Sequence, residues 1–551
     1  MFSTPLRTRT ENSLGLRIAG YDSSTVKLPE KRQISRYTLT RLLTKSQQIH
    51  EALRHTNTVA TQIGPVNKAH IPFAPTKNCI NERNGITKRL IHAQKLPSKN
   101  ICKQLEDYVN EHIVPKIKPL PPGVTRESLE KDWYNDCSYS RKRKDALHEL
   151  YHNYTIEHGT DWTTDLMRCK MFMKEELYWE KKHPRLIISR NDTFKALVGP
   201  YAHAFDKELF HGYFARNFVK GKDTAWKVHR MQEISNSYAN ILETDYSSFE
   251  GSQSRRIQDA IELPVFRRFF KYHPDILRLI EMTYEDRAYE DLSMKELRKL
   301  GMHRLQPYIF SKFHGLGLVG NRKSGEMWTS SGNGLLNLTI MKFLAHTKHI
   351  GFDGMVEGDD GFFGVTKAYI WDEDYADLGF TIKLNYATDE NDLSFCGLRY
   401  AKDGTFMIDP ERICRIGWNE KKKYFKCNKK TKLQLLKARA MSMYSEAPNC
   451  PITSVLAHSI IKGIKASPKF DSLDWWDRRI YEENKNNDFT DEPRITMQSR
   501  IAMGKMFGIG PWRQMSLEES FKQDWFSDYR ETIRPELGDY SEEGLINLPV
   551  C

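Results

Sequence analysis

The sequence lacks the features that mark several large classes of protein. Its nine cysteines are scattered, and no two stand at Cys-x-x-Cys spacing, which argues against a disulfide scaffold and a zinc ribbon. No stretch approaches the roughly 18 consecutive apolar residues of a membrane span, and the N-terminus contains no apolar signal-peptide core. The sequence therefore predicts reduced, mostly buried thiols in a cytosolic protein. If the protein works at a membrane, something else tethers it there.

Other motifs are missing as well. No Gly-x-x-x-x-Gly-Lys-Ser/Thr loop is present, so a P-loop nucleotidase or helicase is not expected. We find no internal repeat and no low-complexity tract. The function of this 551-residue chain must therefore be inferred from its composition and from short motifs.

The composition favours a folded protein with an acidic partner. Hydrophobic residues make up 39% and aromatic residues 11% of the chain, which excludes disorder over its whole length. Lys and Arg number 84 against 71 Asp and Glu, giving a net charge of +13. Such an excess points to a polyanion, and nucleic acid is the first candidate.

Composition and periodicity divide the chain into four parts. Residues 1–100 are polar and basic and look like a surface-wrapping arm, whereas residues 101–240 carry mixed helical segments. Residues 241–400 alternate short strands with helices, and residues 401–551 are mainly helical. Nearly all the motifs described below fall in the third part.

The first motif is Gly358-Asp359-Asp360-Gly361, flanked by two short apolar runs. This pattern predicts a β-hairpin with a tight turn, which would lift Asp359 and Asp360 to the tip of a sheet. Two carboxylates placed there suit a divalent cation. An ordinary Asp-Gly turn is the alternative interpretation of this motif taken alone.

The second motif is an apolar strand start, Ile241-Leu-Glu-Thr, that leads to Asp245 and then to a polar and helical segment. A carboxylate at a strand end beside the predicted hairpin would complete a two-metal site of the kind that phosphoryl transfer uses. The acidic oxygen ligands suit Mg²⁺. A helix N-cap is the alternative.

The third motif is a Ser-Gly loop, Ser324-Gly325, that opens onto an apolar helix over residues 335–344. Thr329 and Asn333 are spaced onto the first turns of this helix. Small hydroxyl and amide groups in such a place suit ribose and phosphate recognition. Considered alone, this segment is better explained as a capping loop.

Taken in order, the three motifs resemble motifs A, B and C of the RNA-dependent RNA polymerases of positive-strand RNA viruses, most closely the tombusvirus-like and nodavirus-like groups. Asp245 with Phe249-Glu250 matches motif A, the segment from Ser324 to Asn333 matches motif B, and Gly358-Asp359-Asp360 matches motif C. Glu250 stands where the family has a second Asp, which leaves the details of sugar selection open.

The resemblance extends on both sides of these motifs. The basic segment from Lys170 to Arg190 resembles motif F, and by that likeness Lys174, Arg185 and Arg190 would face the incoming triphosphate or the template. The segment around Lys383 resembles motif D, whose Lys would protonate pyrophosphate. Phe395-Cys-Gly-Leu-Arg-Tyr400 resembles the motif E hairpin, which grips the 3′ end of the product. The template-entry motif G is not identified.

The resemblance implies an α+β right-hand polymerase with fingers, palm and thumb. The palm would be an antiparallel sheet backed by helices, over residues 241–400 with an inserted finger segment, and residues 401–551 would form the thumb and tail. Residues 1–100 would form the fingertips, and residues 101–240 the fingers. Asp245 and Asp359, with Asp360 in support, would hold Mg²⁺, with Mn²⁺ as a possible substitute.

The same resemblance implies the substrates and partners. These are ribonucleoside triphosphates, an RNA template and product, and other viral replication proteins that supply membrane tethering in the host cytoplasm. Glu250, Ser324, Gly325, Thr329 and Asn333 would lie at the nucleotide and its ribose.

A second basic stretch opens the mainly helical part. Its aromatic and basic residues alternate in a way that suits the tracking of an RNA backbone, with Tyr424 or Phe425 near a base. The residues concerned are Lys421, Lys422, Lys423, Tyr424 and Lys426, followed by further lysines. A solvated hairpin that binds nothing is the alternative.

Two rival functions stay open. A reverse transcriptase would usually carry an aromatic-x pair before the two aspartates, where this chain has Gly358. A non-catalytic RNA-binding replication protein would be expected to lose a metal carboxylate, and Asp245, Asp359 and Asp360 are all present.

Overall fold

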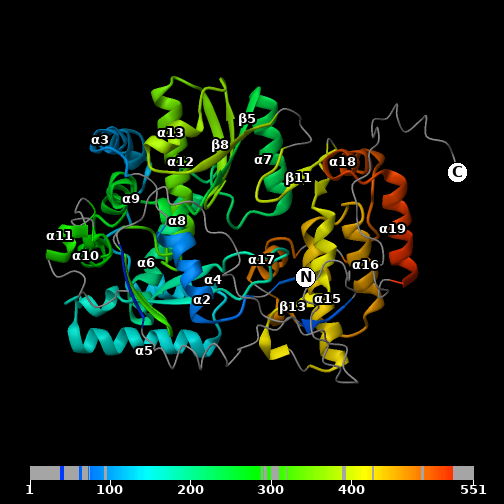
Figure 1. The fold of residues 1–551 in the computed structure, drawn as a ribbon, viewed down its shortest axis with the longest axis horizontal. Coiled ribbons are helices and arrows are strands. Elements are labelled where there is room, and N and C mark those ends of the chain that lie inside the picture. The colour runs from blue at the N-terminus through cyan, green and yellow to red at the C-terminus, as the bar shows by residue number, and fades with distance from the viewer. Residues whose placement is uncertain are drawn as a thin grey trace, which may run out of the picture.

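The protein is a mixed α+β structure, as expected from its sequence. The computed structural model describes residues 37–41, 61–64, 72–73, 75–91, 96–286, 290, 294–299, 309–318, 320–387, 393–401, 403–424, 427–473, 475–485 and 489–524. The strands form two larger sheets, of four and five strands, and helices α7 (Thr224–Ser237), α12 (Thr329–Thr347) and α13 (Asp372–Asp377) lie beside the four-stranded one (Figure 1). Two two-stranded sheets complete the strand pairing in the described residues.

Helices make up most of the described chain. In the first half they are α2 (Cys79–Ile86), α3 (Lys99–Tyr108), α4 (Arg126–Asp136), α5 (Arg141–His158), α6 (Asp192–His211), α7 (Thr224–Ser237), α8 (Phe249–Ser252), α9 (Arg255–Phe269) and α10 (Pro274–Met282). In the second half they are α11 (Met294–Lys299), α12 (Thr329–Thr347), α13 (Asp372–Asp377), α14 (Ile413–Ile416), α15 (Lys429–Glu446), α16 (Thr453–Gly463), α17 (Trp475–Glu483), α18 (Met497–Phe507) and α19 (Pro511–Asp524).

Side-chain caps fix where many of these helices begin. Asn191 accepts a hydrogen bond from the backbone of Phe194 at the start of α6, and Ser254 accepts one from Ile257 at the start of α9. Asn428 caps α15 in the same way. Each cap satisfies an N–H group that has no partner within the helix.

The four-stranded sheet is antiparallel throughout. Its order is β10 (Ile382–Tyr386), β5 (Asn240–Tyr246), β9 (Asp360–Val365) and β8 (Phe352–Glu357). The strand that carries Asp245 is therefore hydrogen-bonded directly to the strand that begins at Asp360. This confirms the expected antiparallel sheet with motifs A and C side by side.

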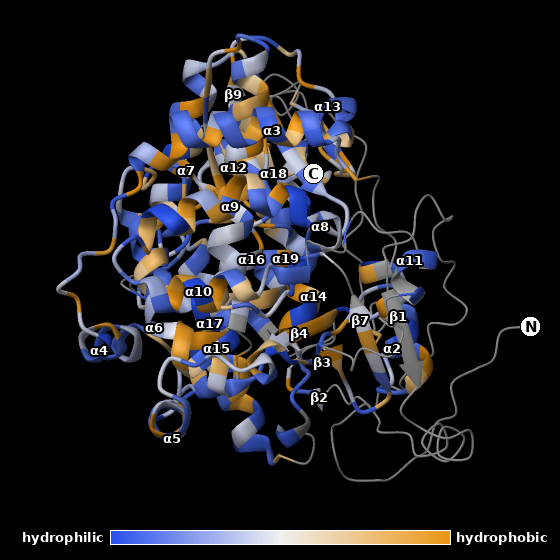
Figure 2. Cartoon of the chain, turned by 90° about the vertical axis from the view of Figure 1, so that its left-hand side faces the viewer, coloured by the Kyte–Doolittle hydropathy of each residue, from blue (hydrophilic) through white to orange (hydrophobic). Residues whose placement is uncertain are grey.

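The five-stranded sheet joins segments that lie far apart in the sequence. Its order is β1 (Tyr37–Arg41), β7 (His314–Leu318), β6 (Ile309–Phe310), β3 (Cys169–Met173) and β4 (Leu186–Arg190). This sheet lies at one side of the molecule beside α2 (Figure 2).

The two small sheets each contain two strands. One pairs β2 (Thr61–Gln62) with β13 (Trp418–Asn419), and the other pairs β11 (Arg399–Tyr400) with β12 (Phe406–Met407). Strands β1 and β2 both come from the first 100 residues and pair with strands from distant parts of the chain. These two short strands thus join sheets whose other strands come from residues 169–190, 309–318 and 418–419.

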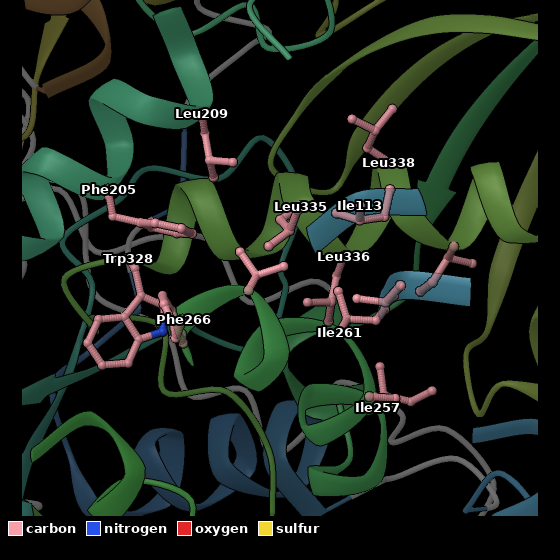
Figure 3. Packing of buried hydrophobic residues seen from close by; sticks show 14 of the residues in the cluster. Ile113, Phe205, Leu209, Ile257, Ile261, Phe266, Trp328, Leu335, Leu336 and Leu338 are labelled. Atoms are coloured by element: carbon pink, nitrogen blue, oxygen red, sulfur yellow. The ribbon is translucent and has the colours of Figure 1, made fainter. Parts of the chain in front are cut away.

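The main core forms around α12, whose residues 335–345 are almost all buried. Phe205 and Leu209 of α6, Phe266 and Ile261 of α9, and Leu335 of α12 pack into one cluster (Figure 3). Because α12 is apolar on nearly every side, it is enclosed by neighbouring helices and by the four-stranded sheet. Helix α12 packs against strands β8 and β9 of that sheet.

A second core joins the helices that follow residue 405. Buried residues of α15, α16, α18 and α19 pack together, and these helices lie on one side of the molecule in yellow to red (Figure 1). Helix α17 packs against α15. The C-terminal part is therefore mainly helical, as the sequence predicts.

The described cysteines are split evenly between buried and half-buried positions. Every cysteine in the described part of the chain is a free thiol, and Cys102, Cys169, Cys414 and Cys450 are buried. Among the described residues, no helix combines the length and the apolar character needed to cross a bilayer.

Candidate active site at the tip of the four-stranded sheet

The hairpin predicted around Asp359 is present. Strands β8 and β9 pair so that Glu357 lies opposite Asp360, which leaves Gly358 and Asp359 as a two-residue turn. Gly358 has a φ of 63°, a value that side-chain-bearing residues rarely adopt. Only the first turn residue has positive φ, as in a type II′ turn, so glycine is required there. The turn places Asp359 at the tip of the sheet.

Asp245 lies at the same edge of the sheet. Thr244 pairs with Gly361 of β9 on one side, and Asp245 itself pairs with Lys383 of β10 on the other. Paired residues of adjacent strands point to the same face, so Lys383 and Asp245 are neighbours there, and both are exposed. The strand-end position predicted for Asp245 is confirmed.

The carboxylates at this edge influence one another. Protein packed around Asp359 raises the pKa of its carboxyl to about 6, although the residue still contacts solvent; the negative charges of Glu250 and Asp245 add to the rise, and Arg185 opposes it. Burial, then the charge of Asp359, raises the pKa of Asp360 to about 7. The fold thus collects acidic groups at this edge, where burial and their mutual repulsion raise the pKa of Asp359 and Asp360.

This donor set fits a hard divalent cation. Within the described ranges, no three acidic, His or Cys side chains form a closed cation-binding cluster. A closed cage is not needed for Mg²⁺, because protein sites for Mg²⁺ commonly supply one or two carboxylates and leave other positions to water and substrate phosphates. Asp245 and Asp359 present carboxylate oxygens of that kind at this edge of the sheet.

Asn337 holds the hairpin tip and was not identified from the sequence. It is buried on α12, and its Nδ2 donates to the carbonyl oxygens of Asp359 at 2.9 Å and Gly358 at 3.4 Å. Its Oδ1 accepts a bond of 3.3 Å from the hydroxyl of Tyr246 on β5. One amide thus connects the turn with the strand of Asp245. A lone Asn within an apolar helical run was the available signal.

The Ser-Gly loop lies against a strand of the five-stranded sheet. The Ser324 hydroxyl accepts a bond from the backbone N–H of Ile188 at 3.1 Å, and the N–H of Gly325 donates to the Ile188 carbonyl at 2.7 Å. A Cβ on Gly325 would lie 2.6 Å from that carbonyl oxygen, so the close approach requires glycine. The Thr329 hydroxyl donates to the carbonyl of Glu326 at 3.0 Å. In the structure, the Ser324 hydroxyl therefore binds strand β4, and the Thr329 hydroxyl binds the loop just before α12.

Asn333 and Glu250 are connected through two residues, Gln253 and Arg322. The Oδ1 of Asn333 accepts a bond of 2.9 Å from Nε2 of Gln253. The Nε of Arg322 donates to Oε1 of Gln253 at 3.0 Å, while the backbone N–H of Arg322 donates to the carbonyl of Glu250 at 3.1 Å. The segment that follows Asp245 is therefore tied to α12.

Known proteins with similar sequences are viral polymerases. The chain is 24% identical over 339 residues to the RNA-directed RNA polymerase of Atlantic halibut nervous necrosis virus, a match that covers 58% of this chain and 30% of that protein. With the polymerase of striped jack nervous necrosis virus it shares 24% over 294 residues, covering 51% and 26%. With that of Pariacoto virus it shares 23% over 331 residues, covering 57% and 29%. In sequence, this chain is similar to nodavirus RNA-directed RNA polymerases over about half of its length.

The sequence similarity covers only part of each relative. The chain spans less than a third of the length of the curated relatives it matches. No family model matches it. The resemblance to nodavirus-like polymerases that the motifs indicated is confirmed by these matches.

Two of the three basic residues that the motif F resemblance singles out are accessible. Lys174 and Arg185 are about half exposed and form ion pairs with Glu176. Arg185 also lowers the pKa of the Asp359 carboxyl, so its charge reaches the candidate active site. The prediction that Lys174 and Arg185 face the nucleotide remains a prediction.

Arg190 requires a correction. Its side chain is buried at the end of β4 and forms an ion pair of 2.7 Å with Glu326, which is also buried. Its Nη1 donates to the carbonyl of Met167 at 3.0 Å. The expectation that Arg190 faces the triphosphate or template is therefore wrong, because its guanidinium is used inside the protein.

Arg185 lines a cavity between the β3–β4 segment and the C-terminal helices. The cavity measures about 530 Å³ and lies between the loop joining β3 to β4 and residues of α14, α15 and α17. Arg89, Arg415 and Trp179 also line it, and the Arg415 guanidinium lies 5.5 Å from the Trp179 ring. Burial and the charge of Arg185 lower the pKa of Arg89. The lining has six basic residues and four acidic ones, Glu175, Glu176, Glu420 and Asp477, so basic residues are in the majority.

The basic stretch near residue 424 also differs from expectation. Tyr424 is buried in the second core and does not face solvent, so its predicted place beside a base is wrong. The Nζ of Lys421 donates to the carbonyl of Leu473 at 2.5 Å, which ties the stretch to the chain before α17. Lys423 is exposed. Phe425, Lys426 and the side chain of Lys422 lie outside the described residues.

Proposed function

We propose that this chain is an RNA-directed RNA polymerase that copies a positive-strand viral RNA genome from ribonucleoside triphosphates. The observation that carries the proposal is the meeting of Asp245 and the Asp359 turn at one edge of an antiparallel sheet, in a chain related to polymerases of that name. Two carboxylates brought together in this way are what nucleotidyl transfer with divalent metal requires.

The proposed architecture is a right hand. Residues 241–400 form the palm around the four-stranded sheet, with the five-stranded sheet's β6 and β7 as a finger insertion. Residues 1–100 and 101–240 form fingertips and fingers, and residues 401–551 form the thumb and tail. The cavity lined by Arg185 lies between the proposed fingers and thumb, which is where a basic channel is expected.

Asp245 and Asp359 would hold the cation, Mg²⁺ or in its place Mn²⁺, with Asp360 in support. When bound, the cation stabilises negative charge on the attacking and leaving oxygens. Arg185 and Lys174 would orient the triphosphate through charge-assisted hydrogen bonds. Lys383, exposed beside Asp245, would give a proton to the departing pyrophosphate.

The proposed sugar site consists of Glu250 and Asn333, near the Ser324-Gly325 loop. A carboxylate accepts and an amide N–H donates, so together they can bind a ribose 2′-hydroxyl, which does both. RNA template and product would be the macromolecular partners. Other viral replication proteins would tether the polymerase to host cytoplasmic membranes.

A direct test is primer-free incorporation of labelled ribonucleotides by the purified chain on a homopolymeric RNA. We expect incorporation of the complementary nucleotide only. RNA binding without incorporation would favour a non-catalytic replication protein. Preferred use of deoxyribonucleotides would favour a reverse transcriptase.

Replacing Arg185 with Ala is expected to raise the nucleotide KM about tenfold, because a charge-assisted bond to phosphate is lost. The measurement is steady-state incorporation at limiting nucleotide. Arg168→Ala is the matched control, since Arg168 is also about half exposed and paired with an acidic side chain, Asp165 at 3.0 Å. Wild-type kinetics in Arg185→Ala would show that the basic strands serve only as a solvated hairpin.

Replacing Asn337 with Leu is expected to lower kcat by roughly 10- to 100-fold, because the Asp359 turn loses its anchor and small displacements of catalytic groups are costly. RNA affinity should stay unchanged. Thr339→Val is the control, since Thr339 is buried on the same helix and its hydroxyl has no hydrogen-bond partner in the described structure. Equal kcat values for the two variants would contradict the anchoring role.

A further inference from the structure

Gln253 lies at the centre of a buried chain of hydrogen bonds. Its side chain is fully buried, and it connects Arg322 on one side with Asn333 on the other. Arg322 is itself held by an ion pair with Glu262, and Glu262 accepts a bond of 2.7 Å from the hydroxyl of Tyr284. All these groups are buried, so the chain has little freedom to rearrange.

The chemistry of Arg322 determines the direction of both hydrogen bonds that the Gln253 side chain makes. A guanidinium has only donors, so the Gln253 atom that faces Nε of Arg322 must be the amide oxygen. The NH₂ group of Gln253 then faces Asn333. A donor facing Asn333 requires an acceptor there, so the Asn333 oxygen is turned toward Gln253. This orientation follows from donor and acceptor counting alone.

Asn333 stands close to the candidate active site. It lies four residues before Asn337 on α12, so the two share one face of the helix. Asn337 holds the Asp359 carbonyl. With its oxygen engaged by Gln253, Asn333 has its NH₂ group left, and that group donates to no protein atom in the described part of the chain.

We propose that Gln253 is a positioning residue that determines sugar specificity by turning the NH₂ group of Asn333 toward the nucleotide. The inference rests on the proposed polymerase function, and it adds a residue and a direction to the sugar site. Gln253 itself lies outside contact with the substrate and acts only through Asn333.

The direction matters because a 2′-hydroxyl has one hydrogen. With Asn333 as donor, the hydroxyl oxygen accepts from Asn333 and the hydroxyl hydrogen goes to the Glu250 carboxylate. If Asn333 were turned round, Asn333 and Glu250 would both be acceptors, and one of them would lose its bond. A deoxyribonucleotide loses both bonds in either case, so turning Asn333 lowers the advantage of ribose.

Gln253→Glu tests the proposal by reversing this polarity. The new carboxylate still accepts from Arg322, but it can no longer donate to Asn333, so the Asn333 amide is expected to turn. The measurement is the ratio of kcat/KM for a ribonucleotide and its 2′-deoxy analogue on one RNA template. We expect the ratio to fall about tenfold, which is the effect of one hydrogen bond to a polar site.

Two further variants keep the test decisive. Asn333→Asp removes the NH₂ group directly and is expected to lower the ratio by a similar factor. Gln253→Met keeps the length of the side chain without either bond, and should also lower the ratio. Gln258→Glu is the matched control: Gln258 is equally buried and accepts from Arg255, but it bonds the Gln253 carbonyl and not Asn333. Its ratio should stay at the wild-type value.

The outcomes separate the possible failures. If the Gln253 variants slow both nucleotides by the same factor and leave the ratio unchanged, Gln253 has only a structural role and the proposal is wrong. If Gln253→Glu does not fold, as judged by thermal unfolding, Gln253→Met and Asn333→Asp decide in its place. If the ratio of kcat/KM values is unchanged in both Gln253→Met and Asn333→Asp, the proposal is also wrong. Absence of any incorporation by the unmodified chain would instead refute the polymerase function.

Discussion

Replacing Asp359 with Asn is expected to abolish nucleotide incorporation while leaving RNA binding nearly unchanged. The substitution keeps the size of the side chain but removes the negative charge that would hold a cation. Removal of a metal-binding carboxylate takes away charge stabilisation of the transferring phosphoryl group, so we expect a loss of at least about 10³-fold in rate. RNA affinity should persist, because it comes from many Lys and Arg contacts to phosphate.

Asp245→Ala should behave in the same way, since Asp245 lies at the same sheet edge as the Asp359 turn. The measurement is labelled-nucleotide incorporation in Mg²⁺ alongside RNA binding by filter retention. Asp353→Asn is a suitable control, because Asp353 lies toward the opposite end of the same hairpin, paired with Gly364. Substantial synthesis by Asp359→Asn or Asp245→Ala would contradict the metal assignment.

Replacing Arg322 with Leu is expected to destabilise the protein by about 3–5 kcal/mol, which is typical when one partner of a buried ion pair is removed. Arg322 is fully buried, forms an ion pair with the equally buried Glu262, and lies 3.6 Å from a carboxylate oxygen of Glu326. Without the guanidinium, both carboxylates lose positive charge in a place that water does not reach. The Gln253 oxygen loses its donor as well.

Denaturation by urea, followed through tryptophan fluorescence, measures this loss, and Trp328 lies buried in the adjoining core. Arg278→Leu is the matched control, since Arg278 forms an ion pair of 2.9 Å with Glu285 while both side chains stay more than half exposed. An exposed pair contributes at most about 1 kcal/mol. Equal losses in the two variants would show that the buried pairing of Arg322 adds no stability.

The buried charges near Arg322 connect the proposed palm and fingers. Arg190 of β4 pairs with Glu326, which precedes α12, and Arg255 at the start of α9 pairs with Asp286 at 2.5 Å. The burial of these groups keeps the loop at Ser324 in register with β4. Stability and positioning of the candidate site therefore depend on the same set of residues.

Part of the candidate site could be predicted from local patterns. A Gly-Asp pair between two apolar runs favours a tight hairpin whatever surrounds it, and a strand start before Asp245 places a carboxylate at a strand end. The order of the motifs added the resemblance to viral polymerases, which the comparisons confirm. These inferences depend on residues close together in sequence.

The errors came from residues whose partners are distant. The resemblance of residues 170–190 to motif F predicts that Arg190 faces the nucleotide or the template. In β4, however, it lies on the same buried face as Leu186 and Ile188, as the alternation of a strand would have indicated. Tyr424 was placed near RNA because lysines surround it, but the aromatic ring is buried in the second core. Charge content alone does not say which side of an element faces solvent.

The sequence by itself determined the hairpin, the strand-end position of Asp245 and the mixed helix and strand composition, because these follow from backbone preference and apolar periodicity. Only the tertiary structure decided that Asn337 anchors the Asp359 turn, that Gln253 orients Asn333, and that Arg190 is internal. Each of these depends on hydrogen bonds or ion pairs between segments far apart in the chain. Such pairing is set by how the elements pack, which short-range sequence patterns do not encode.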